Sequence, residues 1–243
     1  CIRDSIKVEK CKGRLANLVD KMAVDGKPQG HCGIGHTRWA THGEPSDINS
    51  HPHGNKRVSI VHNGIIENYK QIKDFLIEEG YSFVSETDTE TVAKLLDYYY
   101  VDDPVDTIIK VLSEIKGSYA LGIMFRDYPD TVFAVRKECP LIVGVGENEN
   151  FLASDVPAII KYTRDYYLLE ANEIAVVKKD SVQIYDMHKE PVHKEINTAD
   201  WDVDAAEKGG YEHFMLKEIH EQPAAVRDTV SPRIINGMPD LSQ

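Results

Sequence analysis

The sequence predicts an α+β fold built of layers, and two observations lead to this class. Strand-like segments follow one another in hairpin-like runs separated by turn residues, and helical patterns stand between these runs instead of alternating with single strands. The chain has 243 residues, of which 42% are hydrophobic and 28% charged, as is typical of a globular protein with a sizeable core. This composition excludes a disordered or fibrous chain and leaves room for one large domain or two small ones.

Helical patterns dominate the first half of the chain. Leu15, Leu18, Val19 and Met22 recur at the spacing of one helical face, which predicts a helix over residues 14–23. Other residue types then mark the boundaries of later helices. Glycine suits a C-cap, proline the first helical turn and threonine an N-cap. The other elements expected here are strands at 6–9, 33–37 and 58–62, a helix at 68–79 ending at Gly80, a helix from Thr87–Thr89 through Tyr99, and a helix from Pro104 to 115.

Strand patterns dominate the second half. Short apolar runs are separated by turn residues such as those at 128–130, which predicts consecutive hairpins. Pro223 lies inside the last helical pattern and predicts an interruption there. The expected elements are strands at 119–125, 131–135, 141–145, 151–153, 167–177 and 181–186, a short helix at 156–162, and a final helix at 211–229.

Charge and cysteine content limit the partners and the compartment. Forty acidic against 28 basic side chains give a net charge of −12, which argues against nucleic acid or an anionic membrane as a partner. We find no apolar run near the ~18 residues that span a bilayer, and no signal-peptide pattern. The four cysteines form no CxxC pair, so we expect neither a disulfide framework nor a zinc site and assign the protein to the cytoplasm.

Both ends of the sequence look cut. Residues 1–5, Cys-Ile-Arg-Asp-Ser, are what the DNA string TGTATAAGAGACAG encodes, and this string resembles a transposon end used in sequencing libraries. We therefore interpret residues 1–5 as a sequencing scar, with a natural Cys-Ile-Arg-Asp-Ser start as the alternative. Residues 230–243 have the composition of a linker.

Three polar segments next to apolar strands carry candidate chemistry: HTRWATHGEP at 36–45, VHNGIIEN at 61–68 and SETDTE at 85–90. An amide side chain at Asn63 and the flexible backbone of Gly64 offer two donors for an oxyanion, or a simple turn. Arg38 suits a ligand carboxylate or a surface ion pair, and Asp88 a ligand ammonium or a helix cap. Trp39 suits a pocket wall or, by its usual role, the core.

Six of the ten histidines lie between His31 and His62, which raises the question of a metal site. Zinc sites use tight local patterns such as HExxH or CxxC, and neither pattern occurs. Pro52 also keeps His51 and His53 in an extended segment where they share no helical face. We therefore expect no metal and no cofactor.

The motifs HTRWATHGEP, HPH, VHNGIIEN, SETDTE, NFLASD and KEIHEQP follow one another in an order that resembles one family. This is the glutaminase domain of the glutamine–fructose-6-phosphate aminotransferase (isomerizing) family, and the resemblance covers residues 6–243. It implies an N-terminal-nucleophile hydrolase fold, a four-layer αββα sandwich, here without its first strand and helix. On this basis residues 6–229 form a class II glutamine amidotransferase domain, and 230–243 lead toward sugar-isomerase domains that the chain lacks.

The resemblance also implies roles for individual residues. Asn63 and Gly64 would form the oxyanion hole, Arg38 would bind the glutamine α-carboxylate, and Asp88 its α-ammonium. The loop that closes over glutamine would contain Trp39, Thr41 and His42, and His51 is a weaker assignment facing a sugar phosphate. The full-length protein would be a homodimer that uses the ammonia to convert fructose 6-phosphate to glucosamine 6-phosphate.

The nucleophile is where the sequence departs from the family pattern. The family opens with Cys-Gly-Ile-Val-Gly and uses the α-amino group of that cysteine as the base, because its pKa lies near ~8. Here Ile2 follows Cys1, so we expect that Cys1 is not the nucleophile and that this chain alone is inactive. We expect Cys32 and Cys139 to be core thiols and Cys11 to be incidental.

Two other functions remain open on sequence grounds. One is the glutaminase of an amidophosphoribosyltransferase, although Trp39 and residues 217–223 fit the hexosamine-forming family better. The other is a catalytically dead glutamine-binding module that regulates a partner.

Overall fold

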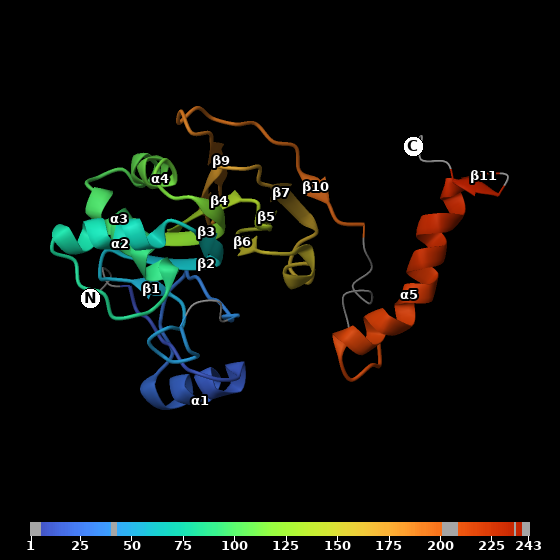
Figure 1. Ribbon diagram of the computed structural model, residues 1–243, viewed down its shortest axis with the longest axis horizontal. Helices are drawn as coiled ribbons and strands as arrows, with labels where there is room; N and C mark the ends of the chain where they lie inside the picture. The colour runs from blue at the N-terminus through green and yellow to red at the C-terminus, as the bar shows by residue number, and fades with distance from the viewer. Residues whose placement is uncertain (1–5, 40–42, 201–208, 236, 240–243) are drawn as a thin grey trace. The chain divides into compact units, whose positions relative to one another are not determined.

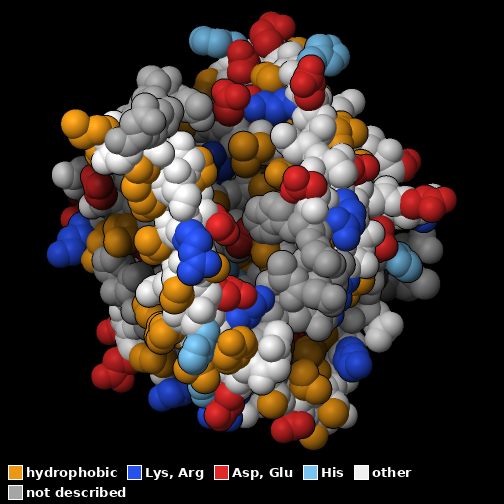
Figure 2. Space-filling model, turned by 90° about the vertical axis from the view of Figure 1, so that its right-hand side faces the viewer, with side chains coloured by type: hydrophobic (Ala, Val, Ile, Leu, Met, Phe, Trp, Pro, Cys, Tyr) orange, Lys and Arg blue, Asp and Glu red, His pale blue; other side chains and the backbone are white. Residues whose placement is uncertain are grey.

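The structure, a computed structural model, describes residues 6–39, 43–200, 209–235 and 237–239. The chain divides into two compact units, residues 1–199 and residues 200–243. The first unit contains two sheets and most of the helices (Figure 1). In the part of the chain that the structure describes, no helix is long and apolar enough to cross a membrane. The face displayed in Figure 2 intersperses acidic and basic side chains over its surface.

The larger sheet is antiparallel throughout and has the strand order β1-β2-β3-β4-β8-β9. Its centre is the long pair β2–β3, in which Ile60 lies opposite Ile123 and Gly64 opposite Tyr119. Apolar residues in alternation place one face of this pair in the core. The strands are β1 (His53–Gly54), β2 (Val58–Ile66), β3 (Gly117–Phe125), β4 (Thr131–Lys137), β8 (Ile174–Lys178) and β9 (Val182–Tyr185).

Three helices pack on one face of this sheet (Figure 1): α2 (Tyr69–Glu78), α3 (Asp88–Tyr99) and α4 (Pro104–Leu112). The predicted N-cap of α3 and the predicted first-turn proline of α4 are both present. Thr87 accepts a hydrogen bond from the backbone N–H of Glu90, and Asp103, which was not predicted as a cap, accepts from two N–H groups at the start of α4. The sequence periodicity therefore predicts these helices and their buried faces correctly.

The smaller sheet has the order β10-β7-β5-β6 and packs against the other face of the larger one. Small side chains at Ala120, Ala134 and Ala175 face it and share a core cluster with Val143 and Leu169. The described residues thus form a helix layer and two sheet layers, in agreement with the predicted α+β class. The strands are β5 (Ile142–Val145), β6 (Asn150–Ala153), β7 (Asp165–Leu168) and β10 (Asn197–Thr198).

Two predicted strands near the N-terminus are absent from the described structure. Residues 6–9 and 33–37 have no regular secondary structure, so alternation of residue types did not produce pairing there. The 33–37 segment instead lines a hollow of about 1320 Å³, where Ile34 comes near Gly122 of β3. The helix predicted at 14–23 does form, as α1 (Leu15–Asp25), but none of its side chains is buried.

Three predictions in the second half need correction. Residues 167–177 are two strands, because a turn with Asn172 at φ 64° takes the chain from β7 in one sheet to β8 in the other. The helix predicted at 156–162 shortens to a 3₁₀ turn, η1 (Val156–Ala158).

The predicted interruption at Pro223 is also wrong. The helix α5 (Phe214–Val230) continues through that proline. It belongs to the second unit, together with a 3₁₀ turn, η3 (Ser231–Arg233), and the strand pair β11 (Ile234–Ile235) and β12 (Met238–Pro239).

Candidate active site

The end of β2 supplies Asn63 and Gly64. Gly64 has φ 119°, and a Cβ added there would overlap the carbonyl oxygen of Ser118 on the neighbouring strand. Only glycine therefore fits this strand position. Asn63 is exposed on the same strand, paired opposite Ala120, so the Asn-Gly sequence lies within the sheet and the turn interpretation is wrong.

The first turn of α3 supplies Asp88, which is 4% exposed. Its Oδ2 accepts a hydrogen bond from the backbone N–H of Ile66 at 2.8 Å. Because Thr87 caps the helix, Asp88 is not the cap that one sequence interpretation allowed. The carboxylate lies where the N-terminus of α3 and the end of β2 meet, and helix N-termini favour negative charge.

Arg38 and Trp39 come from the irregular segment before the undescribed residues 40–42. The Arg38 guanidinium donates to the carbonyl oxygens of Gly43, at 3.0 Å, and Glu44, at 3.3 Å. Trp39 is 89% exposed, so its expected place in the core is wrong. It is one of the residues that line a pocket.

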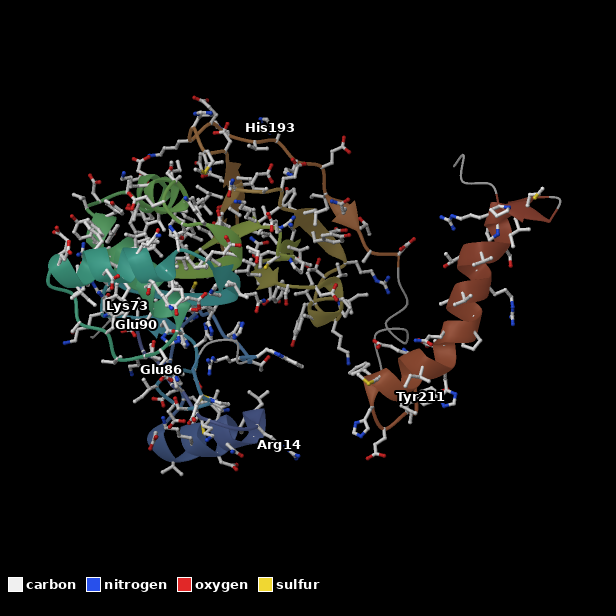
Figure 3. The ribbon with its side chains drawn as sticks, in the orientation of Figure 1. Arg14, Lys73, Glu86, Glu90, His193 and Tyr211 are labelled. Carbon is white, nitrogen blue, oxygen red and sulfur yellow. The ribbon has the colours of Figure 1, made fainter. Side chains whose placement is uncertain are left out.

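Asn49 anchors the loop to which Arg38 is bonded. Its buried Nδ2 donates to the Glu44 carbonyl oxygen and to Glu86 Oε2, both at 3.0 Å. Its Oδ1 accepts from the backbone N–H of Glu86 at 3.0 Å. Glu86, labelled in Figure 3 together with Glu90, lies in the loop that leads into α3. One amide thus joins the Arg38 loop to the start of the helix that carries Asp88.

These elements surround one pocket of about 300 Å³, at the small end of the range for ligand sites. Six of the residues predicted for the site line it, and they come from four separate segments of the chain. The predicted residues Cys1, Thr41 and His42 lie outside the described residues. The six are Arg38, Trp39, His51, Asn63, Gly64 and Asp88, and the lining also includes His36, His62, Thr87 and Ser118.

A row of histidine rings forms one side of this pocket. The ring centroids of His36 and His51 are 4.2 Å apart, and those of His51 and His53 are 5.1 Å apart. Burial, together with these neighbouring rings, lowers the pKa of His51 to about 2, and burial lowers the pKa of His53 to about 4. Both rings are therefore neutral near pH 7.

Sequence reasoning named His51 for this site but not His36, although both lie in the histidine-rich stretch. His36 Nε2 is 2.7 Å from Asn63 Oδ1. Within the described residues, no group of three or more His, Cys, Asp or Glu side chains is placed to hold a metal ion.

The cysteines take less buried places than predicted. Cys32, Cys139 and Cys11 are all only half-buried. Burial raises the pKa of the Cys32 thiol, so it is poorly suited to act as a thiolate nucleophile. Cys139 packs against the core between the sheets.

Comparison with known proteins identifies the family of the chain. A family described as "Glutamine amidotransferase domain" matches residues 36–161, a range that contains all the described residues lining this pocket. The chain belongs to this family.

Within it, the similar relatives share one name, glutamine–fructose-6-phosphate aminotransferase [isomerizing]. The protein of that name from Caldanaerobacter subterraneus subsp. tengcongensis is 58% identical over 234 residues, and the one from Clostridium acetobutylicum is 56% identical over 236. Each match covers 96% of this chain but only 38% and 39% of the relative. The chain thus spans somewhat more than a third of the length of these relatives.

Solved structures support the fold. Glutamine phosphoribosylpyrophosphate amidotransferase from B. subtilis matches with a TM-score of 0.53 at 24% identity, covering 63% of this chain and 34% of that one. A structure titled as the allosteric regulatory enzyme of purine biosynthesis matches with a TM-score of 0.55, also at 24% identity and with the same coverage of both chains. At this identity the likeness shows the fold alone, in agreement with the predicted fold class, and carries no argument about the phosphoribosyl alternative.

Proposed function

We propose that this chain is the glutaminase domain of a glutamine–fructose-6-phosphate aminotransferase. The observation that carries the proposal is the single pocket that unites Arg38, Asn63, Gly64 and Asp88. A guanidinium and a carboxylate at one site match the carboxylate and ammonium of an amino acid. The amide of Asn63 matches the oxyanion that forms when a glutamine amide is attacked. The relatives' name favours fructose 6-phosphate as the acceptor of the ammonia.

Glutamine hydrolysis is a transfer of the acyl group to water. The α-amino group of the family's first cysteine takes the thiol proton, and the thiolate attacks the side-chain amide carbon of glutamine. The C–N bond then breaks, and ammonia leaves with the proton that the α-amino group returns. Water then cleaves the thioester to give glutamate. The full-length protein, as a homodimer, would pass the ammonia to fructose 6-phosphate and form glucosamine 6-phosphate. With Ile2 after Cys1, we expect the chain by itself to bind glutamine without hydrolysing it.

The test is an assay of the full-length protein with glutamine and fructose 6-phosphate, measuring glutamate and glucosamine 6-phosphate. Phosphoribosyl pyrophosphate replaces the sugar phosphate in the control reaction. We expect both products with fructose 6-phosphate and no amine transfer in the control. Transfer only to phosphoribosyl pyrophosphate would establish the alternative acceptor, and glutamine binding with no turnover would establish a regulatory module.

The oxyanion assignment has its own test in the same protein. Asn63→Ala should lower kcat for glutamine hydrolysis roughly 10²–10³-fold, because the lost donor acts mainly in the transition state. The KM for glutamine should change far less. Asn55→Ala is the control, since its side chain holds a turn through the N–H groups of Arg57 and Val58 and does not line the pocket. Equal effects of Asn63→Ala on kcat and KM would reject the assignment.

A further inference from the structure

His36 makes a contact that bears directly on the orientation of the Asn63 amide. The two ends of an asparagine amide have nearly the same shape, yet only the nitrogen donates a hydrogen bond. An oxyanion is stabilised by the nitrogen end and repelled by the oxygen end. The neighbour of Asn63 that selects one end therefore decides whether this side chain can serve as an oxyanion donor.

His36 selects the nitrogen end for the pocket. Its Nε2 lies 2.7 Å from Asn63 Oδ1, a short hydrogen bond between residues 27 positions apart in sequence. An amide oxygen can only accept, so Nε2 carries the proton and donates. With Oδ1 held in this way, the amide nitrogen is the atom left for a ligand, and the bond to Oδ1 polarises the amide toward stronger donation.

The surroundings of His36 favour the tautomer with its proton on Nε2. Its Nδ1 is buried and has no hydrogen-bond partner among the described residues. A proton there would be a buried donor without an acceptor, beside the ring of His51 at 4.2 Å. His36 thus has one tautomer that satisfies Asn63 without burying an unpaired N–H.

The histidine row connects this orientation to the other side of the pocket. The ring of His51 contacts His53, whose Nε2 lies 3.2 Å from Thr87 Oγ1. Thr87 caps the helix that begins with Asp88. A packed chain of side chains therefore runs from the oxyanion amide to the helix turn that carries the predicted ammonium ligand.

We propose that His36 is a positioning residue that donates to Asn63 Oδ1 and keeps the amide nitrogen directed at the reacting carbonyl. The inference rests on the proposed glutaminase function. His36 acts through Asn63, so its loss should slow the chemical step while leaving the contacts of Arg38 and Asp88 with glutamine in place.

The kinetic test uses the full-length protein and glutamine hydrolysis. His36→Phe keeps the ring but removes the donor, and we expect kcat to fall roughly tenfold to a hundredfold, less than for loss of the amide itself. KM should stay within about twofold. His36→Gln places an amide N–H near the position of Nε2, and it should recover most of the lost kcat. An unchanged kcat in His36→Phe, or no recovery in His36→Gln, overturns the proposal.

A double-mutant cycle separates positioning from a structural role. In the Asn63→Ala background, His36→Phe should cause no further loss of kcat, because its target is gone. A full additional loss there would show that His36 acts on something other than Asn63, and would overturn the proposal. A wild-type protein without glutaminase activity would instead contradict the proposed function.

A spectroscopic test of the chain does not depend on activity. With ¹⁵N-labelled histidine, His36 should give the signals of a ring that carries its proton on Nε2, and the Nε2 signal should shift in Asn63→Ala. A ring protonated at Nδ1 would contradict the inferred hydrogen bond whatever the activity of the protein.

Discussion

The carboxylate of Asp88 accepts a hydrogen bond from the backbone N–H of Ile66 at 2.8 Å. This contact joins the first residue of α3 to the last residue of β2, across 22 positions of sequence. The same carboxylate faces the pocket in which we place the glutamine ammonium. One buried group thus has a structural partner and a predicted ligand.

The two roles of Asp88 can be separated with two variants. Asp88→Ala leaves the Ile66 N–H without its acceptor and should lower the free energy of unfolding by about 1–3 kcal/mol. Asp88→Asn keeps an acceptor oxygen and should be closer to wild type in stability. Both variants should bind glutamine much more weakly, because neither carries the charge. Calorimetric titration and thermal unfolding measure these effects, and wild-type affinity in Asp88→Asn would refute the ammonium role.

Gly64 should tolerate no side chain. In Gly64→Ala the new Cβ would overlap the Ser118 carbonyl oxygen at a backbone φ of 119°, so the strand pair must shift. We expect a loss of more than about 1 kcal/mol in the free energy of unfolding. The control is Gly33→Ala, where a Cβ would meet nothing within 4 Å. Equal melting temperatures for the two variants would contradict the crowded geometry at β2.

Acid should destabilise the protein through the histidine row. The folded pKa of His53, about 4, lies below the ordinary value of 6.5, so the unfolded state binds the proton more tightly. The stabilising contribution of the neutral ring is complete above pH 6.5 and is lost as the pH falls toward about 4. The total effect is on the order of 3 kcal/mol.

The pH dependence of unfolding by urea tests this effect. His53→Gln has no titrating ring and should flatten the decline of stability between pH 6.5 and about 4. His51 shifts in the same direction, so some decline should remain. His193, labelled in Figure 3, is exposed, and His193→Gln provides the matched control with an unchanged profile. An equal decline in His53→Gln and the wild type would refute the assignment.

Asn49 should affect glutamine binding without touching glutamine. It holds the Glu44 carbonyl oxygen, to which Arg38 is also bonded, and it anchors that loop to Glu86. Asn49→Ala should weaken glutamine binding several-fold and lower stability by about 1–3 kcal/mol, since buried partners lose their hydrogen bonds. Glu86→Gln keeps an acceptor for Asn49 and should bind glutamine nearly as the wild type does. Calorimetric titration checks both, and unaltered affinity in Asn49→Ala would contradict the role of the loop.

Local patterns predicted four helices and most strands of the larger unit correctly, whereas the helix expected at 156–162 is only a 3₁₀ turn. The helices α2, α3 and α4 follow from apolar periodicity, together with the cap at Thr87 and the first-turn Pro104. The segment at 33–37 shows the same alternation as a strand, yet it has no pairing partner in the described structure. Strand formation requires a neighbour, which residue alternation does not supply.

The pocket likewise combines features that local motifs predict with features that depend on neighbouring elements. The motifs predicted six residues that do line one pocket. They did not decide between Thr87 and Asp88 as the helix cap, and they did not predict the exposed place of Trp39. The cap depends on which side chain reaches the free backbone N–H of the helix, and the exposure of Trp39 depends on which residues pack over its ring.

The sequence by itself determined the α+β class, the family and the residue types of the site, because periodicity, caps and motifs are local properties of the chain. Tertiary structure alone decided that Asp88 bonds the end of β2, that Asn49 joins two loops, and that His36 faces Asn63. These contacts span 22, 37 and 27 positions. Their geometry comes from the register of β2 with β3 and from the packing of α3 on the sheet, which no local pattern encodes.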